Sequence, residues 1–349
     1  MKGSILNETT DRQRFLLTLV IHEYVNQAQP IGSNHLVERY HLELSSATVR
    51  NELAALTEMG YLRQPHTSAG RVPTEEGYRF FVGRLVEQSE LPATTRRTIS
   101  HQFYQIRQDV EQWMRLAASV LAHQSRAASL VTAPHAEQAR VKHLELIGIR
   151  GRQVLLVLVL VGGELHQQML TLPEPVSQEQ LSAAANHLTG LCQGKSPEEL
   201  GELDSQLSTL EQDVLALIIR DMSSTTASVA GEVFLDGLTN VLSEPEFSGN
   251  EDARRALRLL EERSMLEDLL SRTVMTSGVD GVQVLIGGEG TWEDLRQCSV
   301  ILARYGAPGL ATGTLGILGP MRMSYGKSIS TVRFLAGLLS DLVAETLVD

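Results

Sequence analysis

The hydrophobic positions near the start of the chain recur at the spacing of amphipathic helices. In the segment 9–27, Phe15, Leu19 and Val20 predict the buried stripe of a first helix. A stretch that contains proline and glycine ends this pattern, and Ser33 is expected to cap a short second helix. Two short helices in succession, each with one apolar face, indicate a small helical unit at this end of the chain.

A third helix is predicted to begin at Ser45 or Ser46. The side-chain oxygen of either serine can accept a hydrogen bond from a free backbone N–H of the first turn. Val49, Leu53 and Leu56 follow at spacings of four and three residues, which places them on one face of the helix. This face is expected to be the buried one.

The opposite face of this third helix lacks the long charged side chains of an ordinary solvated helix. It carries Ala47, Asn51 and Ala54, with Thr48 and Arg50 beside them. Small side chains allow a helix to approach another surface closely, and arginine and asparagine are the side chains that bind guanine and adenine edges in the major groove. The face therefore indicates contact with DNA bases. The plainer alternative is an amphipathic surface helix without a ligand.

A short polar hairpin is predicted directly after this helix. Gly60 can end the helix in the left-handed conformation, residues 61–63 have the pattern of a strand, and the return strand ends at Pro73. A helix followed by a polar hairpin with a basic tip is the order of a winged helix-turn-helix, in which the hairpin reaches phosphates or the minor groove. The expected tip residues are His66, Thr67, Ser68 and Arg71.

The middle of the chain begins with a long helical pattern and continues with strands. The helical pattern at 94–123, with Trp113 among its apolar residues, is interpreted as a connector that also packs against a partner subunit. An antiparallel sheet is expected next, with the nearly continuous apolar run 154–161 at its centre. Its predicted strands lie at 128–132, 142–149, 154–161 and 164–172.

A block of mostly helical pattern separates these strands from a second set. Helices are predicted at 177–192, 207–221 and 250–271, strands at 282–286, 299–303 and 313–318, and a last helix at 329–347. Sheet, helical block, sheet and helix in this order indicate one α+β domain interrupted by an insertion.

The chain is acidic overall, with a formal net charge of −12. Residues 1–90 hold nine Lys and Arg against eleven Asp and Glu, so most of the acidity lies beyond the predicted DNA-binding unit. We therefore expect modest non-specific affinity for DNA and binding that depends on a correct site. No apolar run reaches the ~18 residues that span a bilayer, and the start of the chain lacks the apolar stretch of a signal peptide. A soluble, cytoplasmic protein with no membrane partner is expected.

The sequence lacks the motifs of catalysis and of metal binding. Its ten histidines form no metal-ligand spacing, and Cys192 and Cys298 are expected to be buried free thiols. We expect that the protein is not an enzyme and that it binds no cofactor and no metal. Near the end of the chain, Arg322 is expected to pair with a carboxylate and to lock the sheet to the last helix. A small anion bound at Arg322 is the alternative.

Two segments far apart in the chain resemble the same family. QPHTSAGRVPT at 64–74 and GILGPMRMSY at 316–325 are similar to segments of the HrcA family of heat-inducible transcription repressors. The first string is long and low in degeneracy. The resemblance implies an α+β protein with a winged helix-turn-helix DNA-binding domain at 1–90. It further implies a GAF-like antiparallel-sheet domain at 91–175 and 273–349 that holds an inserted dimerisation domain at 176–272.

The same resemblance implies what the protein does. It implies a bacterial repressor of chaperone operons that binds an inverted-repeat operator in double-stranded DNA as a homodimer. It also implies that a GroEL-type chaperonin keeps the repressor active until heating fills the chaperonin with unfolded protein. The alternative is a small-molecule-sensing DNA-binding regulator that acts through the GAF-like domain. The residues expected to contact DNA are Ser46, Ala47, Thr48, Arg50, Asn51, His66, Thr67, Ser68 and Arg71.

Overall fold

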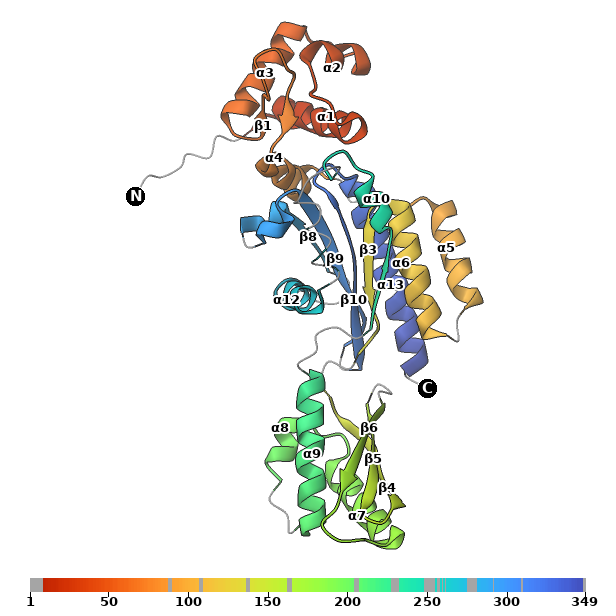
Figure 1. The fold of residues 1–349 in the computed structure, drawn as a ribbon. Helices are drawn as coiled ribbons and strands as arrows, with labels where there is room; N and C mark the ends of the chain where they lie inside the picture. The colour runs from red at the N-terminus through yellow and green to blue at the C-terminus, as the bar shows by residue number, and fades with distance from the viewer. Residues whose placement is uncertain are drawn as a thin grey trace.

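The computed structural model has three packed regions stacked into an elongated molecule (Figure 1). We call them the head (9–86), the sheet body (93–135 together with 232–347) and the lower body (139–226). The fold is mixed α+β, and the strands of each sheet pair antiparallel. The structure describes residues 9–86, 90–106, 109–135, 139–161, 165–203, 207–226, 232–247, 255, 258, 260, 262–274, 281–290, 292–308 and 310–347.

The head has the predicted order of helices followed by a hairpin. Val49, Leu53 and Leu56 are buried, as the sequence predicted, because the third helix packs on the first two. The elements are α1 (Asp11–Gln27), α2 (Ser33–Tyr40), α3 (Ser46–Glu58), β1 (Leu62–Arg63), β2 (Val72–Pro73), α4 (Glu75–Phe80) and the π-helix η1 (Phe81–Leu85).

Two local predictions in the head are wrong. Phe15 is 50% exposed, whereas Leu16 and Leu17 are fully buried. The reason is that α1 is covered by α3 on one side and by β2 and η1 on another, which shifts the buried arc away from Phe15. Ser33 does not cap α2, since it is the first helical residue and Gly32 occupies the cap position without a side-chain bond.

The sheet body is built on a sheet with the strand order β7-β3-β10-β9-β8. Helices α6 and α13 cover one face, and α12 lies on the other side (Figure 1). The central strands β9 and β10 are therefore buried on both faces. The strands are β3 (Ala128–Thr132), β7 (Val233–Asp236), β8 (Val282–Ile286), β9 (Cys298–Ala307) and β10 (Ala311–Pro320). The helices are α5 (Ala93–Gln105), α6 (Val110–Ser125), α10 (Leu238–Leu242), α12 (Arg263–Val274), α13 (Tyr325–Leu347) and the short 3-10 turns η2 (Gly287–Gly290) and η3 (Glu293–Leu295).

The long helical pattern at 94–123 forms two helices, α5 and α6. Trp113 of α6 is 1% exposed and belongs to the core of the sheet body. Helix α6 is thus a layer of the sheet body, and packing of this segment against a partner subunit stays a prediction. The first part of the predicted helix at 250–271 lies mostly outside the described residues, which are continuous from 262, and its last part belongs to α12.

The lower body contains the second sheet, in the order β4-β5-β6. The run 154–161 forms its central strand, as predicted. However, the prediction that the strand at 128–132 belongs to this sheet is wrong, because it is β3 of the sheet body. Leu156, Leu158 and Leu160 pack in a separate cluster with the helices that follow them. The elements are β4 (Val141–Arg150), β5 (Gln153–Leu160), β6 (Leu165–Thr171), α7 (Gln178–Cys192), α8 (Pro197–Gly201) and α9 (Thr209–Thr226).

The head and the sheet body share one continuous hydrophobic core. At their junction Tyr78 of α4 stacks against Tyr325 of α13, with ring centroids 5.9 Å apart. Arg322 pairs with two carboxylates, Glu244 and Glu246, and donates to the carbonyl of Val25 at 3.3 Å. Arg322 therefore binds the end of β10 to α1 of the head, which corrects the prediction that it locks the sheet to the last helix.

Cys192 and Cys298 are both buried and free, as the sequence predicted. Among the residues that the structure describes, no helix is both long and apolar enough to cross a membrane.

Candidate nucleic-acid interface

The third helix begins with a side-chain cap. The Ser45 hydroxyl accepts a hydrogen bond from the backbone N–H of Thr48 at 3.1 Å, and the two hydroxyl oxygens lie 2.9 Å apart. Ser45 is therefore the cap, and Ser46 is the first helical residue. Gly60 follows the helix with a φ of 85°, a left-handed conformation that glycine adopts without strain.

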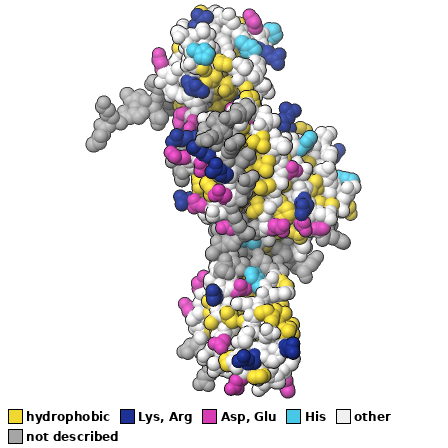
Figure 2. Space-filling model, viewed as in Figure 1, with side chains coloured by type: hydrophobic (Ala, Val, Ile, Leu, Met, Phe, Trp, Pro, Cys, Tyr) yellow, Lys and Arg dark blue, Asp and Glu magenta, His cyan; other side chains and the backbone are white. Residues whose placement is uncertain are grey.

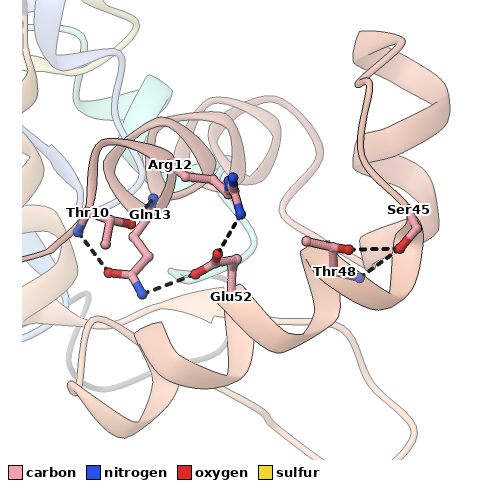
Figure 3. A network of polar contacts seen from close by, with 6 residues as sticks. All are labelled: Thr10, Arg12, Gln13, Ser45, Thr48 and Glu52. Atoms are coloured by element: carbon pink, nitrogen blue, oxygen red, sulfur yellow. Dashed lines mark hydrogen bonds and ion pairs between the residues drawn. The ribbon is translucent and has the colours of Figure 1, made fainter.

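The start of α1 holds α3 through a chain of polar contacts (Figure 3). Gln13 closes the first turn of α1 with Thr10, and its amide donates to Glu52 of α3 at 3.1 Å. Arg12 reaches the other carboxylate oxygen of Glu52 at 3.4 Å. Glu52 therefore faces α1. The other side of this turn of α3 faces the solvent.

The outward side of α3 carries the residues that the sequence singled out. Ala47, Arg50 and Asn51 are exposed, and Ser46 and Thr48 are half-buried. Within the described part of the chain, neither Arg50 nor Asn51 has a hydrogen bond or an ion pair. Their polar groups are therefore available to another molecule.

The tip of the hairpin is closed by a side chain. The amide of Gln64 donates to the carbonyls of Thr67 and Ala69 at 2.9 and 3.0 Å. This bonding uses the backbone acceptors of the turn and leaves the side chains of His66, Thr67 and Ser68 exposed.

The base of the hairpin is bound to the turn between α1 and α2. Ile31 and Arg71 exchange two backbone hydrogen bonds of 2.8 Å each. At Gly70 a Cβ atom would meet the carbonyl carbon of Ile31 at 2.4 Å, so only glycine fits there. The Arg71 Nε donates to the Thr57 hydroxyl at 3.0 Å. Arg71 thus lies at the base of the hairpin beside α3, which corrects its predicted position at the tip.

A groove with a volume of about 400 Å³ lies between α3, the hairpin and the start of α2. It brings together four of the predicted residues, Arg50, Thr67, Ser68 and Arg71. Ser46, Ala47, Thr48, Asn51 and His66 lie outside its lining. The groove is also lined by Ser33, Asn34 and Gln64, which the sequence-based prediction missed. Ser33 and Asn34 could have been found from their position in the first turn of a predicted helix, because the free N–H groups of a first turn attract anions.

A buried carboxylate connects α1 to α2 beneath this surface. Glu23 has a side chain that is 5% exposed, and it accepts a hydrogen bond from the Tyr40 hydroxyl at 2.9 Å. The His35 Nε2 lies 2.8 Å from its other oxygen. The hydrogen bond with His35 is the largest of the effects that hold the pKa of Glu23 below its usual value. Glu23 is therefore a carboxylate at neutral pH and orders the helix that carries Ser33 and Asn34.

Comparisons with known proteins agree on one family. The family model described as "HrcA protein C terminal domain" matches residues 111–329. A heat-inducible transcription repressor HrcA of Roseiflexus castenholzii is 45% identical over 97% of this chain and 95% of its own length. The repressor of the same name from Chloroflexus aurantiacus is 43% identical over 96% of this chain and 94% of its own length.

This chain belongs to the HrcA family. Its similarity to the named HrcA repressors extends over the head as well as over the region that the family model covers. A crystal structure of a hypothetical protein matches 98% of this HrcA-family chain and 99% of its own, with a TM-score of 0.60 and 24% identity. That likeness extends to the fold alone.

Replacing Glu23 by Gln tests the carboxylate that orders the head. Because folding lowers the pKa of Glu23, its stabilising effect is present above the unfolded-state pKa of about 4.3 and is lost as the pH falls through the lower folded-state pKa. We expect Glu23→Gln to reduce the free energy of unfolding by about 1–3 kcal/mol at pH 7. Urea unfolding followed by circular dichroism would show this difference, and it should shrink below about pH 4.

The matched control is Glu38→Gln on the exposed side of α2, which should leave the free energy of unfolding unchanged. A Glu23→Gln deficit that stays constant down to acidic pH would contradict the assigned charge.

Proposed function

We propose that this HrcA-family protein represses heat-shock genes by binding operator DNA through its head. The observation that carries the proposal is the outward side of α3. There the side chains of Arg50 and Asn51 are exposed and have no partner among the described residues, and Arg50 shares a groove with the polar hairpin. The order of helices and hairpin supports a winged helix-turn-helix, with α3 in the major groove and the hairpin against phosphates or the minor groove. No catalytic role is proposed.

The proposed base contacts come from α3. Arg50 suits bidentate bonding to guanine, and Asn51 suits bidentate bonding to adenine. Ser46 and Thr48 would contact phosphates or base edges, although the Thr48 hydroxyl also belongs to the helix cap. The small side chain of Ala47 allows the helix backbone to approach the bases closely.

The proposed backbone contacts surround the groove. His66, Thr67 and Ser68 would reach the DNA from the tip of the hairpin, whereas Arg71 would reach it from the base. Ser33 and Asn34 are added as phosphate contacts because they lie on the same groove in the first turn of α2. Such contacts position the protein and leave sequence selection to Arg50 and Asn51.

The domain division that we propose follows the packing of the chain. The winged helix-turn-helix would end near residue 90, and the GAF-like domain would comprise 93–135 and 232–347. The insertion would be the lower body, 139–226, because its sheet and helices share a hydrophobic cluster that contains no other described residue. This division replaces the boundaries at 176 and 272 that the sequence suggested.

We propose that the lower body forms the homodimer through the outer face of its sheet. Leu155, Val157 and Val159 line the centre of that face, opposite the buried leucines of the same strand. Hydrophobic side chains gather on the lower body in Figure 2 as well. A solvated antiparallel face is normally polar, so an apolar one indicates a partner. The flanking apolar residues, 41–56% exposed, are Ile147, Ile149, Leu165 and Met169.

The regulated genes and the chaperonin partner are proposed because the chain belongs to the HrcA family. The relatives are named heat-inducible transcription repressors, which supports repression that ends on heating. The dimer would bind an inverted repeat whose half-sites are multiples of ~10 bp apart. The resemblance is also the ground for proposing a GroEL-type chaperonin as the partner that keeps the repressor active.

Arg50→Ala tests the base-reading role. We expect it to weaken binding to the inverted-repeat operator by ~1–3 kcal/mol and to relax sequence preference, because a bidentate base contact is lost. Arg71→Ala should weaken operator and random duplexes alike, because its proposed contact is with the backbone. Fluorescence anisotropy on both duplexes measures the two effects.

Arg97→Ala, on the exposed side of α5, is the matched control and should bind both duplexes like the unaltered protein. An equal loss of Arg50→Ala on operator and random DNA would exclude base reading by this residue.

The double variant Ile147→Glu with Met169→Glu tests the dimer face. These residues flank Leu155 on neighbouring strands, so two like charges on each subunit should prevent the faces from packing. We expect a monomer in sedimentation velocity, with circular dichroism like that of the unaltered protein. The control Leu242→Glu alters a residue of α10 that is 48% exposed and should remain dimeric. A double variant that still forms dimers would place the interface elsewhere.

A further inference from the structure

A cavity of about 1020 Å³ lies where the head meets the sheet body. Its walls come from α1, the hairpin and α4 of the head, and from η2, η3 and the β10–α13 turn of the sheet body. Figure 2 shows basic and acidic side chains mixed on the surface just below the head. Ligand pockets in proteins are typically ~300–1,000 Å³, so the cavity is large enough for an organic metabolite.

Four arginines and three glutamates line the cavity, and one of the arginines has no ion pair in the described part of the chain. Each lining carboxylate in the described part of the chain is paired with a lining arginine. The pairs are Arg322 with Glu246, Arg79 with Glu75, and Arg296 with Glu293. Arg63 of β1 also lines the cavity, and it has no ion pair or hydrogen bond among the described residues. Arg322 and Arg79 each pair with a second carboxylate behind the lining, Glu244 and Glu76. Arg63 is therefore the lining arginine that pairs with no carboxylate of the described chain.

Tyr78 has a buried hydroxyl without a hydrogen-bond partner. The side chain lines the cavity and is 2% exposed. Its hydroxyl interacts electrostatically with Tyr325 of α13 and with Tyr24, Arg322 and Glu246 of the cavity wall. Burial raises the pKa of Tyr78 well above its usual value, so the group keeps its proton. A buried donor without an acceptor destabilises a protein, and a hydrogen bond to a ligand oxygen would remove that cost.

Tyr24 adds a second phenol on the same wall. It is half-buried, burial raises its pKa, and it interacts electrostatically with Arg63. Glu246, the carboxylate that raises the pKa of both phenols, is paired with Arg322. Arg63, Tyr24 and Tyr78 are thus three donors that line one cavity.

We propose that this cavity binds a small organic anion whose carboxylate or phosphate group is held by Arg63, Tyr24 and Tyr78. The half-buried ring of Trp292, together with Pro73 and Met321, provides the apolar surface for the rest of the ligand. The site lies between the head and the sheet body and not within the GAF-like sheet. It goes beyond the proposed repressor function, because anion binding here requires no DNA.

The test uses Trp292 as a reporter in the full-length protein without DNA. Trp292 lines the cavity, whereas Trp113, the other tryptophan, is buried in the core of the sheet body. Inorganic phosphate, citrate and sodium chloride are titrated at matched ionic strength while tryptophan emission is recorded. We expect a saturable change with phosphate or citrate that is absent with chloride and lost in Trp292→Phe. The stronger of the two anions identifies the preferred acceptor group.

Tyr78→Phe and Arg63→Gln should each weaken anion binding at least tenfold. Because the Tyr78 hydroxyl has no partner, Tyr78→Phe should melt at the same or a higher temperature without anion, which a merely structural hydroxyl would not do. Tyr104→Phe and Arg97→Gln, both exposed on α5, are the matched controls and should bind as the unaltered protein does.

The proposal is overturned if chloride reproduces the signal, if no anion gives a saturable change, or if both cavity variants bind normally. Operator binding measured on the same preparation tests the proposed repressor function independently of anion binding.

Discussion

The burial of one stripe of α3 is the constraint on which the rest of the head depends. Val49, Leu53 and Leu56 have at most 3% of their surface exposed, and their packing against α1 and α2 fixes the rotation of the helix about its axis. With that rotation fixed, Arg50 and Asn51 face outward without partners in the described chain. A helix that instead packed through its alanine face would bury both polar groups at a cost of about 1–3 kcal/mol for each unsatisfied group.

The hairpin and the junction between the head and the sheet body extend the effect of this packing beyond α3. Gly70 allows the hairpin to approach the backbone of Ile31, which aligns the exposed tip with the outward side of α3. Below the head, Tyr78 and Arg322 join it to the sheet body through stacking, ion pairs and a shared core. The head is therefore not a freely tethered unit, and whatever alters the junction alters the direction in which α3 points.

The sequence predicted local elements well because periodicity and capping are local properties. Strands 128–132 and 282–286 have the predicted bounds, and the buried stripe of α3 is confirmed. Apart from the exposed Phe15 and the missing Ser33 cap, the failures concern which elements and side chains pair with one another. An alternating pattern identifies the buried face of β5 but not the sheet it joins, and Arg322 pairs with carboxylates 76 and 78 positions away. For the candidate site, the residues of α3 and the hairpin tip were accessible to sequence reasoning, whereas the groove contributed by Ser33 and Asn34 depends on tertiary packing.

The central claim, sequence-specific DNA binding by a protein of negative net charge, is tested most directly by one titration. Fluorescence anisotropy would compare a duplex that carries the chaperone-operon inverted repeat with a scrambled duplex over a series of salt concentrations. The account predicts a preference of ~10³ or more for the inverted repeat, with a shallow dependence on salt because few basic groups contact phosphates. Equal, weak binding to both duplexes, unchanged when GroEL-type chaperonin is added to the same sample, would contradict it.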